Sequence, residues 1–378
     1  MRGKRRNSPE LPDASAGTPE ERRERARQDF TFFRRAYFPH YCLVGGDSRL
    51  HEWLDAELPR MADAPEGVRL AIAAPRGEAK STFVSLFFVL WAVLTGRKHY
   101  ILIIADALEQ AASLLGAVKD ELEFNEALKR DFPGAGKGHV WNVGTVVTPG
   151  NVKIQALGAG KRMRGLRHGP HRPDLIVLDD LENDGNVDKP EQRDKLQSWL
   201  QKTVLNLGAA DGSMDVVYVG TLLHYDSVLA RTLRKPLWKA RTFRSILRWP
   251  DRMDLWDEWE SLLSSRGEAE ARRFYRQHRA KMEAGAEVSW PASRPLYRLM
   301  CLRVEDREAF DSEQQNDPLS ANEAPFNGCI TFWVDRSRDW LLFGAVDPSL
   351  GKQGAGRDPS AILVGGFLRG SMTLDVVE

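Results

Sequence analysis

Two short segments constrain what this chain can fold into more than any other feature. Residues 71–82 read AIAAPRGEAKST, an apolar strand followed by a turn and the start of an apolar helix. Residues 173–184 read PDLIVLDDLEND, a second apolar strand that ends in two aspartates. A phosphate-binding loop followed by a carboxylate-tipped strand is the arrangement that nucleoside triphosphate hydrolysis requires. The sequence therefore predicts an ATP and Mg²⁺ site in an α/β fold.

The first segment approximates the phosphate-binding loop (P-loop), in which Gly, four residues and a second Gly precede Lys and Ser or Thr. Ala74 and Ala79 stand at the two glycine positions, and Gly77 lies between them. Lys80 is expected to reach the β- and γ-phosphates, and Ser81 is expected to hold Mg²⁺. The alternative is a lysine-bearing strand–turn–helix without a ligand, because alanine adopts positive φ less readily than glycine.

The second segment supplies the acidic residues. Residues 175–178 form a continuous apolar run, which is typical of a strand buried on both faces of a parallel sheet. Such a strand delivers Asp179 and Asp180 to the carboxyl end of the sheet, where α/β proteins bind ligands. We expect Asp179 to complete the Mg²⁺ shell and Asp180 to orient and deprotonate the attacking water, with Glu182 as the substitute for Asp180. The alternative is a solvated acidic turn.

Strand and helix patterns alternate between residue 68 and residue 247. This alternation predicts a parallel sheet with helices on both faces. The expected strands are 68–74, 100–105, 174–179 and 214–220, and the expected helices are 80–95, 107–130, 190–207 and 226–234, the last with Asp226 as its N-cap. Residues 140–157 are expected to form a β-hairpin with a Pro-Gly turn.

Composition predicts the domain organisation and excludes some classes of protein. Residues 1–20 are expected to be a disordered basic arm, 21–250 the P-loop domain, and 251–326 a helical connecting subdomain rich in Trp and Arg. The net charge of +1 hides local asymmetry such as MRGKRR at the amino end. No apolar stretch reaches membrane-spanning length, and the amino end lacks the apolar core of a signal peptide. Three widely spaced cysteines match no zinc motif, which indicates a reducing compartment.

Two further segments are candidates for coupling and for contacts outside the site. Thr221 follows the strand 214–220, where a polar side chain beside the P-loop can sense the γ-phosphate. The alternative is that Thr221 merely ends a strand. The Gly-rich loop 158–172 carries Arg162, Arg164 and Arg167, which can grip DNA phosphates or present an arginine finger to a neighbouring subunit's ATP. The alternative for this loop is a solvated basic surface.

The pattern changes again after residue 326. The strand 340–346 ends in Asp347, a Gly-rich turn follows, and the next strand begins at residue 360. Ribonuclease H-like nucleases begin in this way, and two-metal cleavage requires several carboxylates around two Mg²⁺ ions. Only Asp347 and Asp358 are candidate ligands here. Residues 327–378 are therefore expected to be the start of an incomplete ribonuclease H-like domain.

Taken in order, these motifs resemble the large subunit of a tailed-bacteriophage terminase. The matching stretches are APRGEAKST, RGLRHGPHRPDLIVLDDLEND, QRDKLQSWLQKTVLNLG, VGTLLHYDSVL, FDSEQQNDP and FGAVDPSLGKQGAGRDPSAILVGG. The resemblance implies a RecA-like ATPase that moves double-stranded DNA into a procapsid and a nuclease that cuts the concatemer. It also implies a homo-oligomeric ring in the host cytoplasm, with a portal protein and a small terminase subunit as partners. The P-loop residues that it implies are Arg76, Gly77, Glu78, Ala79, Lys80, Ser81 and Thr82.

Two other readings stay open at this point. A DNA helicase or other RecA-like remodeller would share the nucleotide site, although residues 251–378 show no second sheet of that kind. A non-hydrolysing DNA-binding assembly protein with a decayed P-loop would explain Ala74 and Ala79. Against the latter, Lys80, Asp179 and Thr221 are retained together.

Overall fold

The computed structural model describes residues 17–42, 44–318, 339–347, 361–368 and 373–376. The chain divides into two compact units, Met1–Glu323 and Ala324–Glu378. Residues 1–16 of the predicted basic arm lie outside the described residues, as does the predicted boundary near residue 326. Helix α1 (Pro19–Gln28) begins inside the predicted arm, because Thr18 and Glu21 form a capping box at its start.

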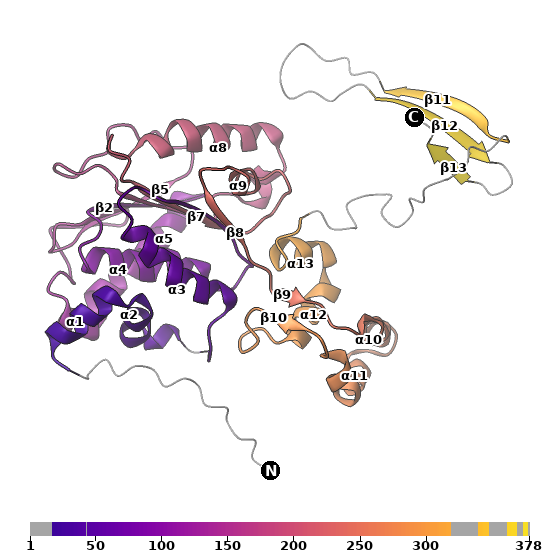
Figure 1. Cartoon of the computed structure of the whole chain (residues 1–378), viewed down its shortest axis with the longest axis horizontal. Helices are drawn as coiled ribbons and strands as arrows, with labels where there is room; N and C mark the ends of the chain where they lie inside the picture. Colours follow the sequence, from indigo (N-terminus) through magenta and orange to yellow (C-terminus); the bar gives the residue numbers. More distant parts are fainter. Residues whose placement is uncertain (1–16, 43, 319–338, 348–360, 369–372, 377–378) are drawn as a thin grey trace. The chain divides into compact units, whose positions relative to one another are not determined.

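An eight-stranded sheet forms the centre of the first unit (Figure 1), in the order β3-β4-β5-β2-β6-β7-β1-β8. Its parallel strands are β5 (Lys153–Gly158), β2 (Tyr100–Ala105), β6 (Leu175–Asp179), β7 (Asp215–Gly220), β1 (Arg69–Ala73) and β8 (Lys239–Thr242). The four predicted strands are confirmed, and they are the buried strands β1, β2, β6 and β7. Strand β8 was not predicted, because its sequence KART is exposed throughout and has no apolar pattern.

The predicted hairpin is confirmed and extends the sheet. Strand β4 (Thr145–Val147) pairs antiparallel with both β3 (Val140–Trp141) and β5. The Pro149-Gly150 turn is closed by a hydrogen bond from the Thr148 amide to the Val152 carbonyl, at 2.9 Å. Since β5 also pairs parallel with β2, the hairpin becomes one edge of the main sheet.

Helices cover both faces of the sheet, as the alternation predicted. One face packs against α2 (Phe30–Tyr37), α3 (Arg49–Ala62), α4 (Val89–Leu94) and α5 (Leu108–Phe124), and the other face packs against α8 (Pro190–Lys202), η3 (Val204–Asn206) and α9 (Val228–Leu233). The predicted helix 107–130 is broken at Asn125, whose side chain caps a separate helix, α6 (Glu126–Asp131). The N-cap of α9 is Ser227 rather than the predicted Asp226, because Asp226 is held by Arg231 instead.

The helical subdomain predicted for 251–326 has its own small core. It contains α10 (Met253–Arg266), α11 (Glu268–Met282), α12 (Leu296–Glu305), α13 (Arg307–Glu313) and the antiparallel pair β9 (Ile246–Arg248) and β10 (Glu287–Val288). Trp256 and Trp259, both 1% exposed, lie in this core with Leu299 and Phe310. The apolar core of the subdomain is therefore separate from the cores on the two faces of the main sheet.

The second unit contains three antiparallel strands, β11 (Leu341–Asp347), β12 (Ala361–Leu368) and β13 (Thr373–Val376). The predicted hairpin is present, and Asp347 is the last residue of β11, opposite Ala361. A sheet of this kind occurs in many folds, so the ribonuclease H-like assignment remains a prediction. Within the described ranges, no helix is long and apolar enough to cross a membrane.

Candidate nucleotide site

The predicted P-loop connects β1 to the helix that begins at Lys80, and two of its residues have positive φ angles. Gly77 has φ of +79° and Ala79 has φ of +56°. The φ angle of Gly77 favours glycine, whereas the nearest atom to a Cβ there, Nη2 of Arg294 at 1.8 Å, is the end of a flexible side chain that can shift. Ala79 adopts the left-handed conformation with its Cβ present, which strains the loop at the glycine position of the motif.

Replacing Ala79 by glycine is therefore expected to stabilise the protein. Glycine removes a strain of about 1 kcal/mol in the folded state, partly offset by the greater freedom of glycine in the unfolded chain. We expect the free energy of unfolding to rise by roughly 0.5 kcal/mol, with nucleotide affinity unchanged or higher. Urea unfolding of A79G beside the parent chain measures this. A matched substitution at Ala74, whose φ is not in the left-handed region, should destabilise the protein.

Lys80 lies at the centre of the site. Its Nζ is 3.2 Å from the Thr221 hydroxyl and 3.2 Å from Oδ2 of Asp180, and the side chain is 8% exposed. The sheet order explains this meeting, since β7 lies directly between β1 and β6 and all three run parallel. The structure thus brings the P-loop lysine, the acidic strand tip and the predicted coupling residue into contact.

Asp179 is buried beside the first turn of the P-loop helix. Its carboxylate accepts hydrogen bonds from the hydroxyls of Ser81, at 2.9 Å, and Ser85, at 2.5 Å. Burial, reinforced by the nearby charge of Asp180, raises the pKa of Asp179. A divalent cation would stabilise this desolvated carboxylate, and Ser81 and Asp179 are oxygen donors of the kind that Mg²⁺ prefers. The residues present therefore fit the predicted Mg²⁺ site.

The position of Ser85 depends on an irregular helix. Residues Thr82–Phe88 form a π-helical segment (η2) that continues into α4. A π-helical turn changes which side chains share a face, and such turns are frequent at functional sites. Here Ser81 and Ser85 both point to Asp179. The contact of Ser85 with Asp179 is not predictable from the sequence, because the position of Ser85 does not distinguish it from any serine in a buried helix.

Asp180 and Glu182 have different environments. Asp180 has φ of +45°, a left-handed conformation that is uncommon for residues with a Cβ atom, although aspartate adopts it more readily than most. Glu182 accepts hydrogen bonds from the amides of Val228 (2.6 Å) and Leu229 (3.0 Å), at the first turn of α9. The Tyr218 hydroxyl also donates to it, at 3.1 Å. Both oxygens of Glu182 thus hold α9 in place, which favours Asp180 as the residue that faces substrate.

A further carboxylate at this edge was missed. Asp106 follows β2, the strand next to β6, and its carboxylate accepts hydrogen bonds from the side-chain amides of Asn183 (2.5 Å) and Asn186 (3.0 Å). The signal was available, since Asp106 directly follows the predicted strand 100–105. The cavity at this edge has a volume of about 220 Å³. Its lining comprises Arg76, Lys80, Asp106, Gln110, Asp180, Glu182, Asn183, Asp184, Thr221, Leu223 and Glu313.

The helical subdomain is bonded to the P-loop. The Arg76 amide donates to the carbonyl of Glu313 at 2.9 Å, and the two side chains form an ion pair. Glu78 is buried and accepts a hydrogen bond from the Ser289 hydroxyl at 3.2 Å. Burial raises the pKa of Glu78, although this hydrogen bond and the charge of His51 oppose the shift. The loop residues therefore contact both the sheet and the subdomain.

The same subdomain also contacts the tip of β7. The Leu222 amide donates to Oδ1 of Asn316 at 2.9 Å, and the amide group of Asn316 donates to the carbonyl of Phe243 at 2.8 Å. Leu222 directly follows Thr221, which contacts Lys80. The helical subdomain thus meets the candidate site at both the P-loop and the predicted coupling strand.

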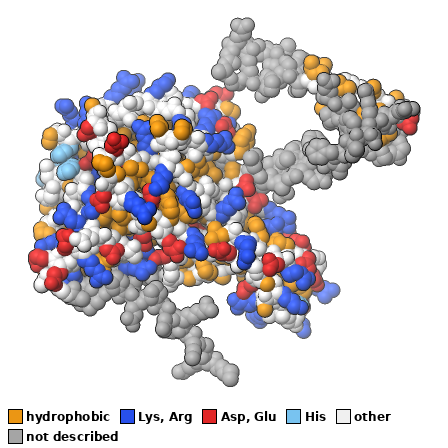
Figure 2. All heavy atoms as spheres, in the orientation of Figure 1, with side chains coloured by type: hydrophobic (Ala, Val, Ile, Leu, Met, Phe, Trp, Pro, Cys, Tyr) orange, Lys and Arg blue, Asp and Glu red, His pale blue; other side chains and the backbone are white. Residues whose placement is uncertain are grey.

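The basic loop lies between β5 and β6 and is anchored at two points. Met163 is buried, and the indole of Trp199 donates to the Lys161 carbonyl at 2.9 Å. The side chains of Arg162, Arg164 and Arg167 are exposed. Figure 2 shows Lys and Arg side chains along the edge of the first unit that carries α8. The three arginines are thus free to meet another molecule, and they do not line the cavity at Lys80.

The predicted nuclease residues are not brought together by the described structure. Asp347 ends β11, and Asp358 lies outside the described residues. Across the ranges that the structure describes, no group of three or more His, Cys, Asp or Glu side chains is arranged to hold a metal ion. The nuclease assignment and its two metal ligands therefore stay predictions.

Comparison with known proteins gives a weak likeness. No model of a known protein family matches the chain, and no curated protein matches it. The ATPase domain of the Thermus phage P74-26 large terminase is similar at 14% identity and a TM-score of 0.33, over 69% of this chain and 92% of that chain. An arginine-to-alanine variant of the same domain gives 14% identity and a TM-score of 0.31, over 67% and 90% of the two chains. At these values the likeness does not identify the chain.

Proposed function

We propose that this chain is an ATP hydrolase that uses Mg²⁺. The observation that carries the proposal is the contact of Lys80 with both Asp180 and Thr221, beside a buried Asp179 that is held by Ser81. Here one buried cation joins the tips of three adjacent strands, with a cavity in front of it.

In this proposal each side chain has one task. Lys80 binds the β- and γ-phosphates and neutralises charge on the transferred phosphoryl group. Ser81 and Asp179 hold Mg²⁺, which supplies charge neutralisation to the phosphates when it is bound. Asp180 orients the attacking water and accepts its proton. Asp106, held by two asparagine amides, lines the same cavity and positions Asn183 and Asn186 beside it.

The identity of the work that ATP hydrolysis drives comes from the ordered motifs in the sequence. We infer a DNA-packaging motor subunit that moves double-stranded DNA, with a portal protein and a small terminase subunit as partners in a homo-oligomeric ring. The contacts of the helical subdomain with Arg76 and Leu222 support this inference, because loss of the γ-phosphate can move the subdomain through either contact.

A non-hydrolysing assembly protein is the second candidate. The strain at Ala79 favours it, since a decayed loop explains an alanine at a glycine position. Nucleotide-dependent turnover separates the two candidates, because only the ATPase predicts phosphate release that disappears when Lys80 is replaced.

The basic loop has a prediction of its own. If Arg164 and Arg167 contact DNA phosphates, replacing either by alanine should weaken DNA binding about equally for all sequences and reduce the salt slope by about 1. If one of them is a finger, turnover should fall by about 10³-fold while DNA binding is unchanged. Binding of a fluorescent duplex at several salt concentrations, measured beside ATP turnover, distinguishes these outcomes. No change in either quantity would mean that the loop is solvated surface.

A further inference from the structure

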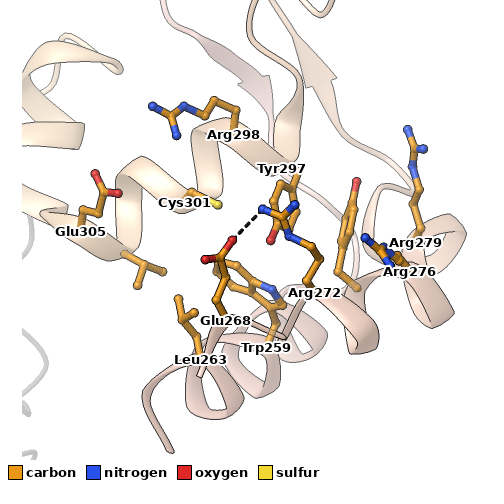
Figure 3. Close-up of a pocket in the computed structure, with 12 residues that line it drawn as sticks. Trp259, Leu263, Glu268, Arg272, Arg276, Arg279, Tyr297, Arg298, Cys301 and Glu305 are labelled. Atoms are coloured by element: carbon orange, nitrogen blue, oxygen red, sulfur yellow. Dashed lines mark hydrogen bonds and ion pairs between the residues drawn. The ribbon is translucent and has the colours of Figure 1, made fainter. Parts of the chain in front are cut away.

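A second cavity lies in the helical subdomain and shares no lining residue with the cavity at Lys80. It is a pocket of about 750 Å³ on the surfaces of α10, α11 and α12 (Figure 3). Trp259, Tyr275 and Tyr297 form its aromatic walls, with ring centroids 5.7 Å apart for Trp259 and Tyr297 and 4.3 Å apart for Tyr275 and Tyr297. Leu263 and Val304 add aliphatic surface. A pocket of this size and composition suits an apolar side chain or a small ligand.

Arginines surround the apolar walls. Arg272, Arg276 and Arg279 follow one face of α11, at the i, i+4 and i+7 spacing, and Arg298 extends outward from α12 in Figure 3. Arg272 pairs with Glu268 at 2.7 Å, and Arg279 pairs with Glu283 at 3.1 Å. Among the described residues, the guanidinium of Arg276 has no hydrogen bond or ion pair. The pocket therefore offers a cationic group that an anionic ligand can use.

An unsatisfied donor gives a second, independent indication of a ligand. Trp259 is 1% exposed, and its indole Nε1 has no hydrogen-bond partner in the described structure. A buried N–H group without an acceptor is costly and uncommon in folded proteins. Figure 3 places the Trp259 indole at the same wall as the Glu268–Arg272 pair. A carboxylate that replaced Glu268 beside Arg272 could also accept from this indole.

We propose that this pocket docks an acidic peptide segment of a protein partner, in which a carboxylate stands next to a large apolar side chain. The apolar side chain packs between Tyr297 and Leu263, and the carboxylate binds Arg272, Arg276 and the Trp259 indole. The chemistry favours a peptide over nucleic acid, because the aromatic and aliphatic walls of the pocket suit an apolar side chain. Duplex DNA would also leave the apolar walls exposed. The proposal goes beyond the ATPase and does not rest on it.

The test uses the full chain and a fluorescein-labelled decapeptide, GSEDLFEDGS, whose binding is followed by anisotropy. We expect saturable binding of this peptide. The peptide GSQNLFQNGS, which has amides in place of the carboxylates, and the peptide GSEDSSEDGS, which lacks the apolar pair, should each bind about tenfold more weakly, because each loses one kind of contact with the pocket. Trp259→Phe keeps an aromatic side chain but removes the N–H together with the five-membered ring, and it should weaken binding by about fivefold. Arg276→Gln should weaken it by about tenfold.

Two variants make the test specific. Glu268→Gln removes the internal competitor for Arg272 and should tighten binding of the acidic peptide, but not of the amide peptide. Arg273→Gln is the matched control, because Arg273 lies on the same helix but does not line the pocket. It should bind like the parent chain, and ATP turnover should be unchanged in all four variants. No saturation up to about 1 mM peptide would overturn the proposal. Peptide binding by Arg276→Gln that equals binding by the parent chain would also overturn it. So would a loss of duplex DNA binding in Arg276→Gln without a loss of peptide binding.

Discussion

Replacing Lys80 by alanine is expected to lower kcat for ATP hydrolysis by about 10³-fold or more, because the phosphates lose their buried cation. Without Lys80, the repulsion between Asp180 and the buried Asp179 is no longer offset by the lysine charge. We expect nucleotide affinity to fall as well, since Lys80 contacts the phosphates in both the ground state and the transition state. Steady-state phosphate release and a fluorescent-nucleotide titration measure the two effects.

Lys98 provides a matched control for this experiment. Its Nζ forms an ion pair with the buried Asp215 at 2.7 Å, at the start of β7 and thus at the other end of the sheet. Lys98→Met should lower the free energy of unfolding by about 3 kcal/mol, because it leaves a buried carboxylate unpaired. The turnover of the folded fraction should not change. If the two substitutions lowered kcat equally, the effect of Lys80 would be structural and the proposed site would be wrong.

Replacing Asp180 by asparagine is expected to separate binding from chemistry. The general base is lost, which corresponds to a decrease in kcat of about 10²–10⁴-fold. Nucleotide affinity should stay the same or increase, because a negative charge near the phosphates is removed. Single-turnover hydrolysis and nucleotide binding, measured on the same sample, test this expectation.

Glu182→Gln is the contrasting substitution, and the two results together decide which carboxylate acts. The glutamine places an NH2 group where one of the two carboxylate oxygens stood, so the first turn of α9 loses one acceptor and the favourable charge. We expect a loss of about 1–2 kcal/mol in stability and a change in kcat below about threefold. A large loss of turnover without a change in thermal stability would instead assign the reaction to Glu182.

The centre of the fold and the core of the site were predictable for a shared physical reason. Strands buried on both faces must be apolar throughout, so β2, β6 and β7 stand out as continuous runs with aspartate or glycine at the carboxyl ends. A parallel sheet then places those ends at one edge. The tips of β1 and β6 therefore lie at the same edge, where the structure has Lys80 3.2 Å from Asp180.

The features that were missed depend on contacts between residues far apart in the sequence. The role of Glu182 depends on α9, which begins 46 residues later. Nothing near Arg76 predicts its pairing with Glu313, and the exposed strand β8 has no apolar pattern. Alanine at position 79 was a reason to doubt that the loop binds phosphate, because alanine adopts positive φ less readily than glycine. The fold nevertheless holds Ala79 at a φ of +56°. Local patterns predicted the elements, and tertiary contacts decided the tasks of individual side chains.

The most direct test of the central claim is phosphate release from Mg·ATP by the full-length chain, with and without double-stranded DNA. We expect ATP turnover that double-stranded DNA stimulates and that both Lys80→Ala and Asp180→Asn abolish. Phosphate release no greater than that of the Lys80→Ala variant, at any chain concentration and with DNA present, would contradict it.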